Sequence, residues 1–265
     1  MKNKPYAELL GILGWFRNQV GPQYGYAFNR LASVTSNPSF RHFQLLKRCL
    51  AHVYNNRKLG WTCHGMHSKR KLDAPELEHL KPNDLFILFD SNFGTTHTSY
   101  PQISAQAYLG FACIMDVSTQ VKLTATSTAE AETVAAFEAC KIAIYIRKVL
   151  AALRMPVEGP VQLFGDNASQ ITICSKSHPS RKCRHWRVRV GFIQEMVDLG
   201  IVQFNKVASV NNASDSTTKI VPGFTWTSLS RFMIGASPKF IPGTQIDVRY
   251  AQQLAREQRE LYPKA

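Results

Sequence analysis

Leu85-Phe-Ile-Leu-Phe-Asp90 is the stretch that decides the fold, because an unbroken apolar run ends here in a carboxylate. Five consecutive large apolar residues predict a strand that is buried on both faces, as in the centre of a sheet covered by helices. Such a strand delivers Asp90 to one edge of the sheet. Val161-Gln-Leu-Phe-Gly-Asp166 repeats the pattern, and Gly165 lets the backbone bend just ahead of the second carboxylate.

Two further acidic residues lie near the starts of expected helices. Ser127 or Thr128 is a natural N-cap for a helix rich in Ala, Ile, Val and Leu, which places Glu132 about one turn into that helix. Asp215 follows a turn-like Asn-Asn pair, so it is expected at a loop-to-helix junction. Taken singly, each acid also fits a structural role, as a turn former or as a complement to a helix dipole.

The order of these elements favours a catalytic interpretation. The sequence pattern predicts a strand that ends in Asp90, two further strands, a helix that carries Glu132 and a strand that ends in Asp166. Helices and Asp215 follow. Hard cations such as Mg²⁺ take oxygen ligands, and two ions about 3.5–4 Å apart clamp the attacking and leaving oxygens of a phosphodiester. Two Mg²⁺ or Mn²⁺ ions are therefore the expected cofactors. The expected metal ligands and catalytic residues are Asp90, Glu132, Asp166 and Asp215.

At these positions the chain resembles the ribonuclease H domain at the C-terminal end of copia-type retrotransposon polyproteins. The similar segments follow the family's order and span about residues 6–220. They are Phe89–Gly94 for the first Asp motif, Ala125–Glu132 for the Ser-Ser-Thr-Glu-Ala-Glu segment, Gly165–Ser169 for the Asp-Asn turn, Arg184–Glu195 for the basic Lys-His helix and Ser214–Lys219 for the Ala-Asp-x-x-Thr-Lys close. Upstream, Leu9–Gly14 and Ser36–Arg48 look like the connection segment between polymerase and ribonuclease H.

The resemblance implies a ribonuclease-H-like, mixed five-stranded sheet flanked by helices. It also implies a metal-dependent endonuclease that cleaves the RNA strand of RNA:DNA hybrids. The chain contains no Asp-Asp pair of the kind found in a reverse-transcriptase palm, so polymerase activity is not implied. Asn92 stands where the family commonly has a second acid, and Arg187 where it usually has Asp, which affects substrate handling more than metal binding.

The charge of the chain agrees with a nucleic-acid partner. The 32 Lys and Arg residues against 18 Asp and Glu give a formal net charge of +14, and two tracts, residues 41–71 and 176–189, are basic and free of acids. Such tracts contact phosphates without reading sequence, although a single basic run is more commonly a solvated helix face. The residues expected to bind nucleic acid are Arg41, Lys47, Arg48, Lys182, Arg184, His185, Arg187 and Arg189.

Cysteine spacing and the absence of long apolar runs bound the remaining possibilities. The segment Cys63-His64-x-x-His67 offers three soft ligands without a fourth nearby, so a structural zinc site is not favoured. The N-terminus lacks the apolar core of a signal peptide, and no run approaches the roughly 20 apolar residues of a membrane span. The expectation is a reduced intracellular protein, cytoplasmic or nuclear, without a membrane partner.

Four parts are expected along the chain. They are a helical connection-like segment at residues 1–60, a basic linker with a short strand at 61–82, the ribonuclease-H-like domain at 83–221, and a C-terminal extension with a polar helix at 222–265. Within the domain, the second and third strands are expected at residues 105–115 and 120–126. The long helix is apolar nearly all round from residue 142 to 153, which predicts burial between the sheet and neighbouring helices.

Two classes of function stay open. In the first, the protein is a ribonuclease H-type hydrolase that acts on RNA:DNA hybrids, with a reverse-transcriptase domain or another protein as a partner. In the second, it is a catalytically silent or domesticated module that keeps the fold and the basic surface to bind nucleic acid or to serve as a scaffold. The intact acidic quartet favours the enzyme, whereas the missing polymerase and the added C-terminal extension favour the module.

Overall fold

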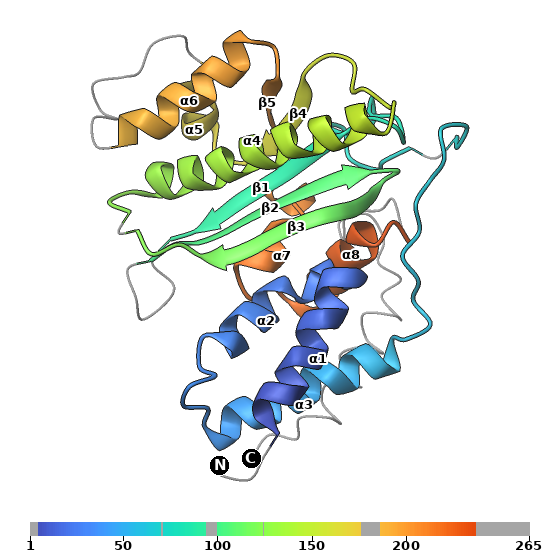
Figure 1. Ribbon diagram of the computed structural model, residues 1–265, viewed down its shortest axis with the longest axis vertical. Helices are drawn as coiled ribbons and strands as arrows, with labels where there is room; N and C mark the ends of the chain where they lie inside the picture. The colour runs from blue at the N-terminus through green and yellow to red at the C-terminus, as the bar shows by residue number, and fades with distance from the viewer. Residues whose placement is uncertain (1–4, 70, 94–99, 124, 176–185, 237–265) are drawn as a thin grey trace.

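The structure is a computed structural model that describes residues 5–69, 71–93, 100–123, 125–175 and 186–236. These residues form a five-stranded sheet with helices on both faces (Figure 1). The strands are β1 (Phe86–Asn92), β2 (Gln102–Leu109), β3 (Ala112–Gln120), β4 (Val161–Gly165) and β5 (Val202–Lys206). Their order is β3-β2-β1-β4-β5. Strand β2 is antiparallel to both of its neighbours, β1 and β3, whereas β4 is parallel to β1 and β5 is parallel to β4. The expected α/β class with a mixed five-stranded sheet is confirmed.

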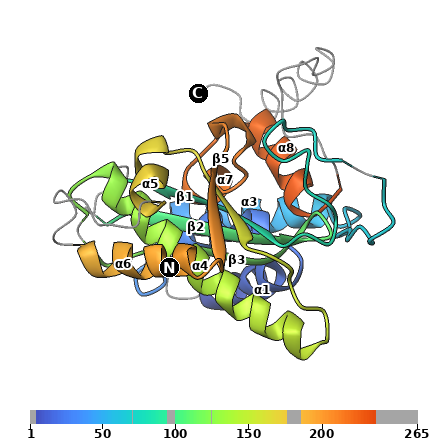
Figure 2. The ribbon, with the colours of Figure 1, turned by 90° about the horizontal axis from the view of Figure 1, so that it is seen from above.

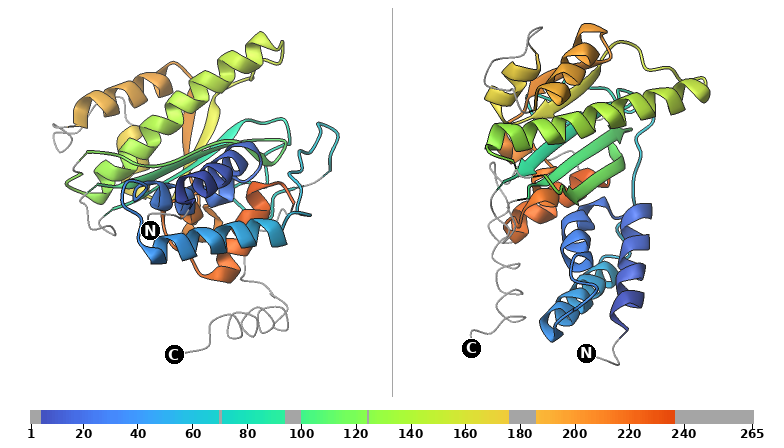
Figure 3. Two further views of the ribbon diagram at one scale, coloured as in Figure 1. Left: turned by 60° about the horizontal axis from the view of Figure 1, so that its bottom comes forward. Right: turned by 60° about the vertical axis from the view of Figure 1, so that its left-hand side comes forward.

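Helices form two layers and an additional N-terminal unit. The helices are α1 (Tyr6–Gln19), α2 (Gly25–Ala32), α3 (Phe40–Asn55), α4 (Thr128–Ala152), α5 (Ala168–Cys174), α6 (Arg187–Asp198), α7 (Asp215–Thr218) and α8 (Gly223–Met233), with 3₁₀ turns η1 (Pro22–Tyr24) and η3 (Ser209–Asn211). One face of the sheet is covered by α4–α6 and the other by α7 and α8 (Figures 1 and 2). On the same side of the sheet as α7 and α8 lie α1–α3, of which α2 packs against β3 (Figures 1 and 3). None of the helices in the described ranges is long and apolar enough to cross a membrane.

The two faces of β1 each contribute to a separate hydrophobic core. Ile87 and Phe89 pack in the core beneath α4, whereas Phe86 and Leu88 pack in the core beneath α8. All four side chains are fully buried, and each contributes about 1.5–3 kcal/mol by leaving water. The prediction of a central strand buried on both faces is confirmed. Its C-terminal end therefore lies in the middle of the sheet edge.

The second and third strands differ from their expected positions. The segments 105–115 and 120–126 were expected as separate strands, but β2 and β3 form a hairpin whose tight turn is Gly110-Phe111. Both turn residues have positive φ, 63° and 57°, as a two-residue turn between twisted antiparallel strands requires. A Phe in the left-handed region carries no sequence signal for such a turn, so the apolar run looked continuous.

The long helix α4 is less enclosed than expected. Ile142, Ile146 and Leu150 pack toward the sheet, but Tyr145 and Leu153 are 57% and 64% exposed. The reason is that α6 runs beside only the first part of α4, and the second part extends past it (Figure 1). The expectation that this stretch is sandwiched between the sheet and helices is therefore wrong.

A strap of residues 61–65 ties the hairpin turn to the end of α8. The amide of Thr62 donates to the carbonyl of Ile234 (2.8 Å), and the amide of His64 donates to that of Gly110 (2.7 Å). The described parts of the segment 61–82 contain no strand, in contrast to the short strand expected there. Instead of forming a strand, the segment makes backbone hydrogen bonds to Gly110 and to Ile234.

Gly235 is expected to be indispensable for this strap. Its φ is +72°, and a Cβ atom there would lie 1.9 Å from the carbonyl oxygen of Thr62. Gly235→Ala should therefore lower the free energy of unfolding by roughly 2 kcal/mol or more. Gly11→Ala is the matched control, because Gly11 lies in α1 with open space around it and should gain about 0.4–1 kcal/mol. Urea unfolding of both variants measures the difference, and equal stabilities would contradict it.

Residues beyond 222 contribute to the domain core. In α8, Leu229, Phe232 and Met233 are buried against β1 and β2, and Phe232 lies 5.1 Å from the ring of Tyr108. Trp226 at the start of the helix packs on the core of α1–α3. The helix thereby links the sheet to the N-terminal unit. The polar helix expected at residues 247–262 lies outside the described residues.

Candidate metal centre

Three acidic residues from three elements meet at one edge of the sheet. Asp90 belongs to β1, Asp166 follows β4, and Glu132 lies near the start of α4; each offers an oxygen within 4.8 Å of the others. Because β1 and β4 are adjacent and parallel, their C-terminal ends bring both aspartates to the same edge. Asp90 and Glu132 are only 2% and 4% exposed. The centre is thus a buried, oxygen-rich cluster.

The start of α4 gives its two glutamates different tasks. Ser127 is the N-cap, and its hydroxyl accepts from the amide of Glu130 (3.2 Å). The Glu130 carboxylate turns back to accept from the amide and hydroxyl of Thr126, at 2.7 and 2.9 Å. This reciprocal arrangement satisfies free amides at the helix start. Glu130 is therefore a capping residue, and Glu132 is the one that faces the cluster.

We expect the two glutamates to separate in a mutational test. Glu132→Gln should remove the metal-dependent phosphodiester cleavage expected from the sequence, because it exchanges a charged side chain for a neutral amide. Glu130→Gln should retain catalysis and lose about 1 kcal/mol of stability through the weakened cap. Cleavage rates and thermal melts of both proteins check this. Loss of activity in Glu130→Gln, with activity kept in Glu132→Gln, would reverse the assignment.

Asp215 lies beside this cluster but makes an ion pair of its own. It begins α7, and its carboxylate contacts the Lys219 ammonium at 2.8 Å. The cluster of mutually close oxygens comprises Asp90, Glu132 and Asp166, whereas the sequence analysis expected Asp215 as a fourth ligand. Asp215 is nevertheless close enough for its charge to act on Asp90.

Three polar side chains, to which the sequence analysis gave no contact role, hold α7 against β1. The hydroxyl of Thr218 donates to the carboxylate of Asp90. Asn212 donates to the carbonyl of Phe89 (3.0 Å), and Asn92 donates to the carbonyl of Thr218 (3.3 Å). Asn92, which replaces a common acid of the resembled family, thus anchors the segment that carries Asp215. The sequence signals for Thr218 and Asn92 were the similarities of the segments Ser214–Lys219 and Phe89–Gly94.

Burial and like charges raise the pKa values of Asp90, Glu132 and Asp215. Burial raises the pKa of Asp90 well above its ordinary range, and the charges of Asp215 and Glu132 add to the shift. Burial, together with the charge of Asp166, raises the pKa of Glu132 to about 8. Burial also raises the pKa of Asp215, against the effect of Lys219. The pKa of Lys219 is raised too, because the carboxylates outweigh its burial.

The donor set fits hard divalent cations. One carboxylate oxygen of Glu132 and one of Asp215 are buried and lack a hydrogen-bond partner in the part of the chain that the structure describes. Unpaired buried oxygens are costly, and a divalent cation would both pair them and relieve the repulsion between the acids. Mg²⁺ and Mn²⁺ prefer such carboxylate oxygens. Among the described residues, Cys63, His64 and His67 do not form a group of mutually close ligand atoms.

The predicted nucleic-acid-binding residues divide between two sides of the sheet. Arg41, Lys47 and Arg48 lie on α3, whereas Arg187 and Arg189 lie at the start of α6, over the opposite face (Figures 1 and 3). The buried Trp186 packs with Ala129 and holds the start of α6 against the start of α4, the helix that carries Glu132. The α6 tract is therefore the one that lies next to the cluster. Lys182, Arg184 and His185 lie outside the described residues.

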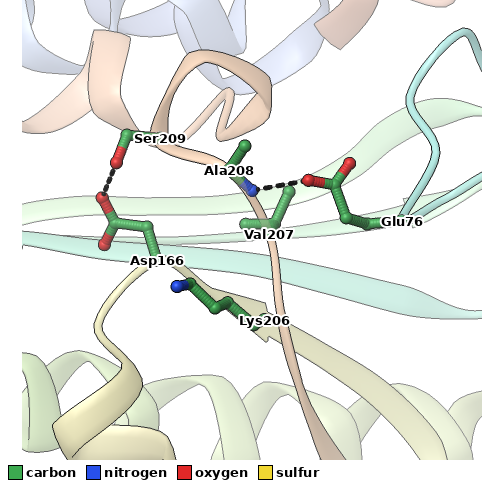
Figure 4. A pocket seen from close by; sticks show the side chains of 6 residues that line it. All are labelled: Glu76, Asp166, Lys206, Val207, Ala208 and Ser209. Carbon is green, nitrogen blue, oxygen red and sulfur yellow. Dashed lines mark hydrogen bonds between the residues drawn. The ribbon is translucent and has the colours of Figure 1, made fainter.

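A small pocket opens beside Asp166. Figure 4 shows its lining, which comes from the end of β5, the following loop and the segment before β1. The hydroxyl of Ser209 donates to Asp166 at 2.6 Å, and Glu76 accepts from the amide of Ala208 at 2.9 Å. Lys206 completes the polar part of the lining. None of these three side chains was identified from the sequence, since they come together only through the path of the loop after β5.

The mixed five-stranded sheet is the one expected from the resemblance described in the sequence analysis, and three of the four expected acids meet at its edge. The chain is similar to the retrovirus-related Pol polyprotein from transposon TNT 1-94 of Nicotiana tabacum, with 25% identity over 222 residues. The match covers 84% of this chain but 16% of that polyprotein, so the chain spans a small part of its relative's length. No model of a known protein family matches the chain.

Solved structures with similar arrangements include ribonucleases H1. The enzyme of the archaeon Halobacterium salinarum NRC-1 matches with a TM-score of 0.38 and 13% identity, over 51% of this chain and 94% of that one. A ribonuclease H1 isolated from compost, solved in complex with an RNA/DNA hybrid, matches with a TM-score of 0.37 and 12% identity, over 51% and 93% of the two chains.

Proposed function

We propose that this protein is a metal-dependent endonuclease that cleaves the RNA strand of RNA:DNA hybrids. The observation that carries the proposal is the buried cluster of Asp90, Glu132 and Asp166, with oxygens within 4.8 Å of one another. The similarity of the chain to a retrotransposon Pol polyprotein supports the choice of an RNA:DNA hybrid as the substrate. We further propose that the chain derives from a copia-type element, that residues 1–60 correspond to the connection segment, and that the protein acts inside the cell.

The acidic residues would hold the ions and orient the substrate. Asp90, Glu132 and Asp166 are the proposed ligands. Asp215 is proposed as a fourth ligand, which requires that its ion pair with Lys219 breaks. The chemistry that two divalent ions supply when bound is activation of a water molecule and stabilisation of charge on the leaving 3′ oxygen. Thr218 keeps the Asp90 carboxylate oriented, and Ser209 does the same for Asp166. Such preorganisation lowers the cost of positioning at the moment of reaction.

The basic start of α6 is the proposed contact with the hybrid backbone. Arg187 and Arg189 lie there, next to the helix that carries Glu132. We propose that Lys182, Arg184 and His185, which precede them, extend this contact. The second tract, with Arg41, Lys47 and Arg48 on α3, is proposed to bind nucleic acid separately, because the sheet lies between the two tracts. A reverse-transcriptase domain is a proposed partner of the N-terminal unit.

Hydrolysis of a labelled hybrid tests the proposal. The purified chain is incubated with an RNA:DNA hybrid in Mg²⁺ or Mn²⁺, with single-stranded RNA, duplex DNA and EDTA as controls. Cleavage of the RNA strand that requires the metal supports the enzyme. Tight hybrid binding without any cleavage would instead favour the catalytically silent binding or scaffold module.

A further inference from the structure

Lys206 occupies a backbone position fixed by the sheet and lines the same pocket as Asp166. In the register of β4 and β5, Lys206 is paired with Gly165, the residue that precedes Asp166. Figure 4 shows the Lys206 side chain extending toward Asp166 along the wall of the pocket. Strand pairing therefore fixes the backbone position of Lys206, and its exposed side chain places the ammonium at the pocket.

The acids that line the pocket are already engaged by other groups. One oxygen of Asp166 accepts from Ser209, and an oxygen of Asp166 is directed to the cluster with Asp90 and Glu132. Glu76 uses both oxygens, one for the amide of Ala208 (2.9 Å) and one for the side chain of Asn211 (3.0 Å). Within the described residues, no ion pair or hydrogen bond neutralises the Lys206 ammonium.

Glu76 has a structural task in this arrangement. Its two hydrogen bonds fix the loop between β5 and α7, and that loop carries the hydroxyl of Ser209. The result is a preformed hollow of about 450 Å³ with a free cation on one wall and a metal ligand, Asp166, on another. A cation held beside a metal centre complements a negatively charged group that spans both.

We propose that Lys206 and this hollow form a subsite for one backbone phosphate of the cleaved RNA strand, adjacent to the scissile linkage. The inference rests on the proposed ribonuclease function and deepens it. Lys206 acts as a positioning residue: its ammonium contacts the non-bridging oxygens of that phosphate and fixes the register of the strand over Asp90, Glu132 and Asp166. Glu76 keeps the loop in place without touching the substrate.

The test compares Lys206→Gln with Lys206→Arg and with Lys148→Gln. Lys148 is exposed on α4, sixteen residues beyond Glu132, or about 24 Å along the helix. Hybrid binding is measured by anisotropy across a salt series in EDTA, and cleavage is measured in Mg²⁺. Lys206→Gln should weaken binding about five- to tenfold at low salt and reduce the salt slope by about 0.9, and it should raise KM more than it lowers kcat. Lys206→Arg should recover most of both effects.

A neutral methylphosphonate placed at successive RNA linkages then locates the contact. The binding deficit of Lys206→Gln should vanish only when the neutral linkage lies within two nucleotides of the cleavage site. A salt slope equal to that of Lys148→Gln, or a deficit that persists at every linkage, overturns the subsite while wild-type cleavage leaves the proposed function standing. If the wild-type protein neither binds nor cleaves the hybrid, the proposed function fails and the subsite fails with it.

Discussion

Asp166→Asn is expected to lower metal-dependent cleavage of an RNA:DNA hybrid by at least about 10²–10³-fold. The substitution removes a charged ligand from a centre in which three carboxylates supply the oxygens, and an amide oxygen binds a divalent ion more weakly. The same change should leave the melting temperature of the metal-free protein equal or higher, because it relieves repulsion from Glu132. Single-turnover cleavage and thermal melts measure the two effects.

Asp198→Asn is the matched control for this experiment. Asp198 is exposed at the C-terminal end of α6, so the substitution removes the same charge outside the centre. It should leave both the cleavage rate and the melting temperature unchanged. Undiminished cleavage by Asp166→Asn, at wild-type metal concentration, would refute the metal assignment.

The placement of Asp90 and Asp166 could be predicted from the sequence because the signals are local. Each carboxylate ends an apolar run, and a run buried on both faces implies a central strand whose end lies at the sheet edge. The N-cap at Ser127 set the start of the helix that carries Glu132, and the choice of Glu132 over Glu130 came from the resemblance to the family's second Glu. These features depend on a few neighbouring residues, so no knowledge of long-range packing was needed for them.

The remaining parts of the centre depend on contacts between distant segments. Gln106 and Ser104 in β2 alternate with apolar residues as on a solvent-facing strand, yet both are fully buried because α7 covers them. Their side chains bond to the Thr217 hydroxyl at 2.8 and 2.7 Å. The placement of Lys206 beside Gly165 likewise follows from the pairing of β4 with β5. An alternating pattern of polar and apolar residues does not show whether the polar face of a strand meets water or is covered by a helix with polar side chains.

The metal-free protein is expected to lose stability as the pH rises from 6.5 to 8.5. Burial and the charge of Asp166 raise the pKa of Glu132 to about 8 in the folded state, whereas in the unfolded chain it titrates near 4.3. Over this interval the folded state therefore holds a proton that the unfolded state lacks, and the free energy of unfolding falls until the pH passes the folded pKa. The limit for one such proton is about 1.4 kcal/mol per pH unit, or about 2–4 °C in melting temperature.

Comparison with Glu132→Gln isolates this effect from other titrations. His52 has a pKa lowered by burial, so its protonation destabilises the fold toward acid pH, and measurements that begin at pH 6.5 limit its contribution. Melts in EDTA should show a steeper decline for the wild type than for Glu132→Gln across this range. Saturating Mg²⁺ should reverse the wild-type trend, because a cation that binds the ionised carboxylates stabilises the folded state more as they lose protons. Parallel pH profiles for the two proteins in EDTA, or a wild-type profile unaffected by Mg²⁺, would show that Glu132 does not belong to a metal-binding cluster. Such a result would contradict the metal-dependent function proposed for the sheet edge, whereas the fold assignment, which rests on the strand order, would hold.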